Sequence, residues 1–438
     1  MLKYIYLILF LFNITNTSCC CKCCCNIGIP EISFNKNTHE NKILYRNIKL
    51  YKEVDSLTGF SHRLDSFCLL RNNRIGYTYG GKFGVINFEN NKKLSLKNLY
   101  KEECDEYCFN DIIELKNGDL LLLSEDGTIK IFRINKSKDG KLSFNLIQKI
   151  YDDDKDPIYT VKELENGDLI TGIWSGFKVY SKVNNEYKIK TRCRLNRYCF
   201  SILEVKPNVV AVTNCSTEEL KIIDLNKIEG KNIVFFKKDK PDNFTSDQWE
   251  SKNDVISVDI DSNIDGITTI KDIRSGERPN LQYYLKDCDL LFIGYEWNKS
   301  EKDKGGVNVV SINQSKLLGC VNLNSIVTAV CPISYNKDVR EFDLLCAVKE
   351  RIYGEKVNYK YDLIQLKFNL NDISDVRFKI VGKKERVHFN EIRKVQYNLP
   401  IDYELKESNK NIIPYIFTHG SEDKTFKVFG LDKNRKIF

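Results

Sequence analysis

A segment of eight residues recurs along the chain, and this internal repeat constrains the fold more than any other feature. The stretch 113–120 reads IELKNGDL, returns 49 residues later at 162–169 as KELENGDL, and follows more loosely at 203–210 as LEVKPNVV. Each copy alternates apolar and polar residues, enters a turn and continues into a second apolar stretch, which is typical of a β-hairpin. Hairpins repeated at roughly this spacing indicate an all-β repeat protein.

A second repeated stretch, apolar and often alternating with lysine, closes each hairpin. It occurs seven times, at 85–88, 129–132, 177–180, 220–223, 307–310, 363–366 and 426–429. The spacing of the early copies suits one four-stranded blade per copy. We therefore predict an all-β fold, a seven-bladed β-propeller of four-stranded antiparallel blades. The longer gap after the fourth copy could hide an eighth blade, but we interpret it as one blade with a polar insertion at 237–253.

Two copies of the repeat resemble the WD-repeat family. Residues 123–132 and 418–429 are similar to the Gly-Ser-x-Asp-x-Thr-x-Lys-x-Trp ending of that family, with Phe132 and Phe429 in place of its tryptophan. The Gly-His dipeptide that opens a WD repeat is missing, so the Asp-His-Ser/Thr-Trp hydrogen-bond tetrad is not expected in its usual form. The resemblance implies a ring that shares one blade between the two ends of the chain. The strand-like stretch 43–51 is well placed to complete that last blade.

The first 18 residues have the character of a targeting segment. Lys3 precedes an unbroken apolar run from Tyr4 to Phe12. A membrane-spanning helix needs about 20 residues, so this run is too short and matches the core of a signal peptide. We interpret residues 1–18 as a signal peptide cleaved near Ser18 or, alternatively, as an uncleaved membrane-targeting segment. Both interpretations predict a secreted or membrane-associated protein, and a cytoplasmic location is the alternative.

A cysteine cluster follows directly. Six of the 16 cysteines lie at 19–25, and adjacent cysteines cannot easily adopt disulfide geometry with one another. Thiols beside an apolar segment are the setting for S-palmitoylation, which would stabilise a membrane attachment through the N-terminus. A metal-thiolate knot and an unstructured leader are the alternatives. We assign 19–41 to a Cys-rich leader and linker, and 42–438 to the propeller.

The remaining cysteines are scattered, and several fall within predicted strands: Cys68, Cys199, Cys320, Cys331 and Cys346. Buried free thiols pack as small apolar side chains. We expect core residues here and no disulfide framework.

Catalytic and cofactor motifs are missing from the sequence. The four histidines, at positions 39, 62, 388 and 419, are far apart in the chain, and no nucleophile elbow, phosphate loop or dinucleotide fingerprint is present. His419 falls in a WD-like turn, where a structural role is expected. We therefore expect no enzyme activity and no cofactor.

The charge of the chain is evenly distributed. The net charge of +8 is the small difference between 68 basic and 60 acidic residues. Nucleic-acid binding needs lysine and arginine gathered on one face, so we expect no nucleic-acid partner.

One acidic stretch resembles the opening of a calcium loop. Asp261, Asn263 and Asp265 precede Gly266 with the spacing Asp-x-Asn-x-Asp-Gly. The twelfth position holds Asp272 where the loop needs a glutamate, and the flanks look like strands instead of helices. We interpret the stretch as an acidic hairpin turn and expect no metal site.

The three tryptophans mark the predicted binding surface. Trp174 and Trp297 fall in predicted turns between the second and third strands of two blades, and Trp249 lies in the insertion. Tryptophan is enriched among residues that dominate binding energy. We predict a monomeric, non-catalytic scaffold whose protein partner binds these three residues, unless each tryptophan instead covers its own blade.

Two other functions are open. One is a secreted propeller enzyme or lectin acting on glycans, which as a glycosidase would need channel carboxylates about 5–10 Å apart. The other is a cytosolic WD-repeat adaptor.

Overall fold

The alternating segments form strands throughout the part of the chain that the computed structural model describes. That part comprises residues 32–33, 52–57, 64–71, 74–87, 100–103, 108–138, 142–151, 156–195, 198–214, 219–236, 255–259, 265–273, 282–297, 304–323, 325–352, 358–370, 377–397, 415–420 and 425–430. Within it, one short 3-10 helix at Lys286–Cys288 accompanies the strands. Among the described residues, no helix is long and apolar enough to span a bilayer.

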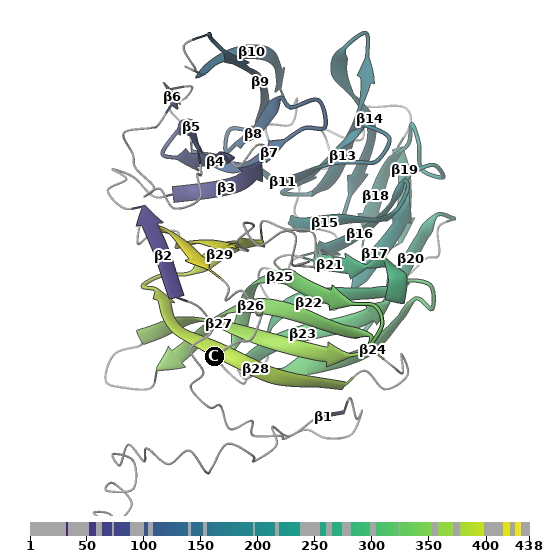
Figure 1. Ribbon diagram of the computed structural model, residues 1–438. Coiled ribbons are helices and arrows are strands. Elements are labelled where there is room, and N and C mark those ends of the chain that lie inside the picture. The colour runs from purple at the N-terminus through teal and green to yellow at the C-terminus, as the bar shows by residue number, and fades with distance from the viewer. Residues whose placement is uncertain are drawn as a thin grey trace, which may run out of the picture. The chain divides into compact units, whose positions relative to one another are not determined.

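The strands group into seven sheets, the blades, which follow one another along the chain (Figure 1). Blade one contains β3 (Leu64–Leu70), β4 (Arg74–Tyr79), β5 (Lys82–Asn87) and β6 (Tyr100–Glu103). Blade two contains β7 (Phe109–Glu114), β8 (Leu120–Ser124), β9 (Thr128–Lys136) and β10 (Leu142–Tyr151). Blade three contains β11 (Ile158–Glu163), β12 (Leu169–Ile173), β13 (Gly176–Val183) and β14 (Glu186–Arg194).

The other four blades repeat this order. Blade four contains β15 (Cys199–Lys206), β16 (Val209–Asn214), β17 (Leu220–Asp224) and β20 (Ile267–Ile270). Blade five contains β21 (Gln282–Leu285), β22 (Leu290–Trp297), β23 (Lys304–Ser311) and β24 (Lys316–Asn322). Blade six contains β25 (Ile326–Asn336), β26 (Glu341–Ile352), β27 (Asn358–Asn369) and β28 (Arg377–His388). Blade seven contains β29 (Ile392–Tyr397), β30 (Tyr415–Gly420), β31 (Thr425–Gly430) and β2 (Lys52–Leu57).

The seven copies of the second repeat are the third strands of the seven blades, which confirms the predicted propeller. Neighbouring blades touch through their first strands, from β3 and β7 onward to β29, which contacts β3 again. The first strands are therefore innermost, surround the central channel and close the ring.

The N-terminal part of the chain completes the last blade. β2 pairs with β31 in antiparallel register, from Lys52 opposite Gly430 to Leu57 opposite Phe426. Figure 1 shows β2, in purple, beside the yellow C-terminal strands. The predicted shared blade is confirmed, but the strand that completes it is Lys52–Leu57. The stretch 43–51 proposed for this role lies outside the described residues.

Two blades carry strands beyond the predicted four. β18 (Asn232–Phe236) and β19 (Val255–Asp259) add in parallel to β14 of blade three, and β1 (Ile32–Ser33) adds to β28 of blade six. β17 and β20 are the third and fourth strands of one blade, and β21 begins the next. No eighth blade therefore forms among the described residues, and the predicted insertion at 237–253 lies outside them.

Apolar side chains gather in seven clusters, and each cluster joins two adjacent blades. Leu64 and Phe67 of blade one, for example, pack with Phe417 and Phe426 of blade seven. The other six clusters span the other six blade boundaries. The core is thus a ring of interfaces, so each blade depends on both of its neighbours.

Four of the five cysteines predicted for the core are buried, and Cys320 is half-buried with its thiol 3.1 Å from the side-chain oxygen of Asn308. All five are free thiols. Burial raises the pKa of Cys68 to about 12, so this thiol packs as an unreactive apolar group.

The repeated Asn-Gly pair forms the turn between first and second strands. Gly118 and Gly167 both have φ +88°, a left-handed conformation that glycine adopts at no steric cost. In blade two the side-chain oxygen of Asn117 also accepts the N–H of Asp119 at 3.0 Å.

The glutamate of the repeat joins blades two, three and four each to the preceding blade. Glu163 accepts a hydrogen bond of 2.6 Å from the backbone N–H of Lys116, and the Lys116 ammonium donates in return to the carbonyls of Leu164 and Glu165. We call this contact the inter-blade clasp. Its glutamate bond recurs from Arg71 N–H to Glu114 and from Glu165 N–H to Glu204, each 2.7 Å long.

Candidate interaction surface

One face of the propeller carries both the turns between second and third strands and the links from blade to blade, because successive strands run in opposite directions. Trp174 lies in such a turn, between β12 and β13. We call this side the Trp174 face. Innermost strands begin at this face, so their first residues surround the mouth of the channel.

Most innermost strands have a β-bulge at this end. The bulge residues are Asp65, Asn110, Tyr159, Phe200, Thr328 and Arg393. A bulge bends the strand and redirects a side chain. In two blades the redirected side chain bonds to the next blade: Asn110 Nδ2 donates to the carbonyl of Ile158 at 2.8 Å, and Thr328 Oγ1 donates to that of Ile392 at 2.7 Å.

In blades three and four the bulge residues are aromatic and meet each other. The ring centroids of Tyr159 and Phe200 are 4.6 Å apart, and Tyr198 stacks on Phe200 at 5.6 Å. Trp174 meets Tyr198 edge to face at 4.2 Å. Trp174 is 39% exposed and the other three rings are half-buried. We call these four residues the aromatic cluster.

The turn that presents Trp174 is fixed by its backbone. The N–H of Trp174 donates to the carbonyl of Pro157 at 3.2 Å, and the carbonyl of Ser175 accepts the N–H of Leu195 at 2.7 Å. The Ser175 hydroxyl also donates to Asp156 at 2.9 Å.

A glycine before the turn allows the next blade to approach. A Cβ atom on Gly172 would overlap the carbonyl oxygen of Cys199, at the start of blade four. This close packing and the backbone bonds give Trp174 a defined position before any partner arrives.

The three predicted tryptophans have different outcomes. Trp174 lies in the predicted turn, whereas Trp297 is the last residue of β22, paired with Lys304 and directly before the equivalent turn of blade five. The side chain of Trp297 and the whole of Trp249 lie outside the described residues. Trp174 contacts Tyr198, which in turn contacts Tyr159 and Phe200, and these three aromatic residues were not predicted from the sequence. Tyr159 and Phe200 hold the same position in adjacent repeats, and aligning 158–164 with 199–205 would have revealed the pair.

Exposed apolar side chains are concentrated on the Trp174 face. Nine large apolar residues are exposed in the described part of the chain, and five lie at this face: Tyr151, Trp174, Ile352, Tyr359 and Phe389. Phe389, in the link to blade seven, is 87% exposed. Val183 and Val339 are at the opposite face, and the other two are on β10. Exposed apolar groups gathered on one face indicate an interaction surface.

Polar side chains of the innermost strands meet across three blades. The Lys394 ammonium of blade seven is 2.9 Å from the Asp111 carboxylate of blade two, and the Ser66 hydroxyl of blade one donates to the same oxygen at 2.7 Å. Burial alone would raise the pKa of Asp111, but Lys394 and these hydrogen bonds hold it below its usual value. The contact therefore links blade seven to blades one and two, across the point where the ring closes.

Lys162 of β11 lies in the electrostatic field of this group. Its side chain is exposed to solvent, and it has no hydrogen bond or ion pair with any described residue. Partial desolvation by the surrounding protein lowers the pKa of Lys162; the charge of Asp111 opposes this effect and that of Lys394 reinforces it.

Comparison with known proteins gives the fold a name. No protein-family model matches the chain, and no curated protein matches it. The WD40 domain of Toxoplasma gondii coronin aligns with 88% of this chain over 88% of its own length, at 9% identity and a TM-score of 0.53. Chaetomium thermophilum Sqt1 aligns with 87% of this chain over 98% of its own length, at 12% identity and a TM-score of 0.51. The chain has the WD40 propeller fold. At these identities the likeness concerns the fold alone.

Part of the WD40 hydrogen-bond tetrad is present in blade seven. His388, at the end of the preceding blade, lies 2.8 Å from Thr418 Oγ1 on β30 through Nε2 and 2.9 Å from Thr425 Oγ1 through Nδ1. This pairing was not expected from the sequence, because His388 is not preceded by glycine and is 30 residues from Thr418.

His419 is buried in the same WD40 blade. Its ring packs edge to face on Phe67 at 5.6 Å. The Asp65 backbone lies nearby, but neither ring nitrogen has a partner with hydrogen-bond geometry in the described residues. Desolvation lowers the pKa of His419 to about 3.

The acidic stretch does not form the predicted hairpin. The strands that flank it, β19 and β20, belong to different sheets, because β19 pairs with β18 and β20 pairs with β17. Asp265 is an exposed residue paired with Lys227 at 2.7 Å, while Asp261 and Asn263 lie outside the described residues. Over the part of the chain that is described, no group of three or more His, Cys, Asp or Glu residues could hold a metal ion.

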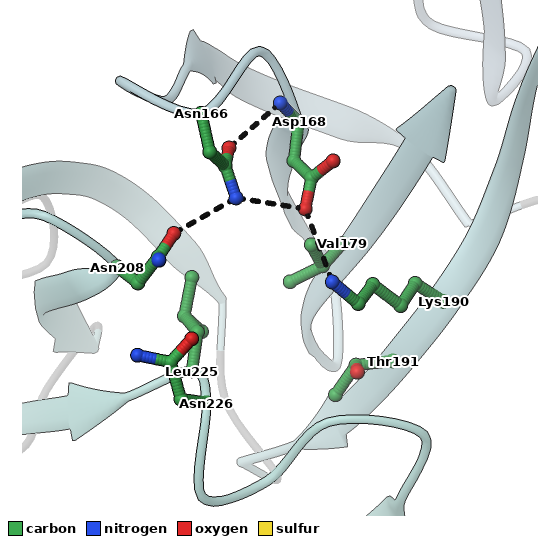
Figure 2. A pocket seen from close by; sticks show the side chains of 8 residues that line it. All are labelled: Asn166, Asp168, Val179, Lys190, Thr191, Asn208, Leu225 and Asn226. Carbon is green, nitrogen blue, oxygen red and sulfur yellow. Dashed lines mark hydrogen bonds and ion pairs between the residues drawn. The ribbon is translucent and has the colours of Figure 1, made fainter. Parts of the chain in front are cut away.

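Figure 2 shows a small polar depression on the opposite face of the propeller. Asn166 donates to Asn208 of the next blade at 2.8 Å and to Asp168 at 3.1 Å, and Asp168 also pairs with Lys190. Because these groups satisfy one another, the depression is a polar joint between blades three and four.

Proposed function

We propose that the chain is a non-catalytic scaffold that binds a protein partner through the Trp174 face of its propeller. The observation that carries the proposal is the aromatic cluster, in which a partly exposed tryptophan stands on a fixed turn. Rigid tryptophan and tyrosine side chains contribute much contact area at little entropic cost and dominate many interfaces.

The distribution of exposed residues supports the same face. Phe389 and Tyr151 extend the apolar surface to other blades, whereas Val183 and Val339 stand singly on the opposite face. The alternative of a glycan-acting enzyme finds less support. The innermost-strand carboxylates Asp111, Glu163 and Glu204 each accept hydrogen bonds from the protein itself.

Substitution of Trp174 tests the proposal. The full chain, wild type or Trp174→Ala, is used to purify partners from cells that express it naturally, and the recovered proteins are quantified by mass spectrometry. The matched control is Val183→Ala, which removes an exposed apolar side chain from the opposite face of the same blade. We expect a partner that the wild type and Val183→Ala retain and Trp174→Ala loses. Full retention by Trp174→Ala would contradict the proposal.

We further propose that the N-terminal segment directs the protein to the secretory pathway or holds it at a membrane. The apolar run from Tyr4 to Phe12 and the cysteines at 19–25 support this, and both lie outside the described residues. The mass of the mature N-terminus, before and after hydroxylamine, tests it. Loss of residues up to about Ser18 indicates secretion, a lipid released by hydroxylamine indicates tethering, and an intact unmodified terminus would contradict both.

A further inference from the structure

Lys162 is a channel cation that has no ion pair of its own with any residue that the structure describes. Lys162 is exposed on β11 and has no ion pair among the described residues, whereas the Lys394 ammonium is 2.9 Å from Asp111. Asp111 and Lys394 therefore neutralise each other, and Lys162 leaves this group with a net positive charge.

The glutamates of the inter-blade clasps are already in use. Glu163, next to Lys162 in sequence, accepts the backbone N–H of Lys116, and Glu114 and Glu204 hold the equivalent places in blades two and four. The clasps direct these carboxylates to the preceding blade, so they leave Lys162 uncompensated.

Lys162 and the aromatic cluster share one strand. Tyr159 precedes Lys162 by three residues on β11, which corresponds to about 10 Å along a strand. An extended peptide has the same rise per residue, so side chains a few positions apart could reach both sites.

We infer that the partner presents an acidic segment, in which an Asp or Glu side chain pairs with Lys162 while a neighbouring aromatic or aliphatic side chain packs on the aromatic cluster. The inference rests on the proposed function and specifies the chemistry of its partner. Opposite charge inside the channel would select among apolar peptides that the cluster alone would bind without discrimination.

The test uses a random 12-residue peptide library, amidated at the C-terminus so that side chains supply the only carboxylates. The library is selected on the full-length chain, wild type, Lys162→Glu and Trp174→Ala, with Val183→Ala as the control. We expect peptides with both an acidic and a large apolar residue on the wild type and on Val183→Ala. Lys162→Glu should lose the acidic preference.

A double-mutant cycle then tests the pair directly. Replacing the acidic residue of a selected peptide by its amide should weaken binding to the wild type by about tenfold. The same replacement should have little effect on Lys162→Met, because the partner of the carboxylate is gone. Unchanged melting temperatures for both lysine variants would confirm that they fold.

The two proposals fail in different ways. Peptides that require Trp174 but show no acidic preference, or no coupling to Lys162, would overturn this inference and leave the proposed function standing. Peptides that bind Trp174→Ala as well as the wild type, or no selected peptide at all, would overturn both.

Discussion

His419 occupies an environment that disfavours its charged form, since burial lowers its pKa to about 3. The unfolded chain takes up this proton near pH 6.5. The stabilising contribution of the neutral ring is therefore complete above pH 6.5 and is lost as pH falls toward 3, at about 1.4 kcal/mol per pH unit.

We expect His419→Phe to weaken this acid sensitivity, because phenylalanine keeps the ring packed against Phe67 and cannot take up a proton. The measurement is the urea midpoint of both proteins at pH 7.5, 6 and 5. The wild type should lose more stability between pH 6 and 5 than the variant. Parallel decline would assign the sensitivity to other groups.

His388 stabilises the last blade through its two threonine partners. His388→Ala removes both bonds and leaves the buried Thr418 hydroxyl without this partner, so the free energy of unfolding should fall by about 1–3 kcal/mol. His388→Gln can keep one bond and should lose less. Thermal denaturation of the three proteins checks the order, and equal losses would show that packing, not hydrogen bonding, matters here.

For single residues, the sequence predicted the position in the repeat better than it predicted the contacts made in space. The turn position of Trp174 followed from the repeat, but its contact with Tyr198 depends on how two blades pack. Lys178 and Lys221 show the same limit. Lysines alternating with apolar residues suggest a solvent-facing edge, yet both are almost fully buried between strands, and Lys221 reaches Thr269 on β20.

Among the elements, the inter-blade clasp explains why the repeat contains a glutamate. Glu163→Ala removes the acceptor of the Lys116 N–H at an exposed position where water can replace it, so we expect a loss of about 0.5–1.5 kcal/mol in the free energy of unfolding. Glu165→Ala is the matched control, since Glu165 enters the clasps only through its backbone. Urea denaturation of both variants measures the difference. An equal effect at the two positions would exclude a specific role for the clasp.

Strand order could be read from the repeat because each hairpin pairs residues close in sequence. Pairings between segments that are distant in sequence could not be predicted from the repeat. β14 pairs in parallel with β18, and β18 with β19, although 18 residues separate the last two strands. The hairpin expected around Asp265 was wrong because β19 pairs with β18 in the sheet of blade three, whereas β20 pairs with β17 in blade four.

For the whole molecule, stability depends on closing the ring. Deleting residues 1–57 removes β2 and exposes the edge of β31, whereas deleting 1–51 keeps the strand. We expect the longer deletion to lower the melting temperature strongly and to promote aggregation, because it removes backbone pairing from a protein whose total stability is about 5–15 kcal/mol.

Thermal denaturation and size-exclusion chromatography of both truncated chains provide the measurement. The shorter deletion should behave like the full chain if Lys52–Leu57 alone completes the blade. Equal destabilisation by both deletions would instead assign the closure to residues before 52.

The pairing of β2 with β31 also means that the order of the blades along the chain is not essential to the ring. Lys52 lies opposite Gly430, so a short linker could join these positions and new ends could be opened in the link between any two blades. Such a circular permutant would keep all seven interfaces while moving the point of attachment around the ring. The cysteine-rich N-terminal segment could then be placed beside any blade, so that the blade nearest to it would become a matter of choice.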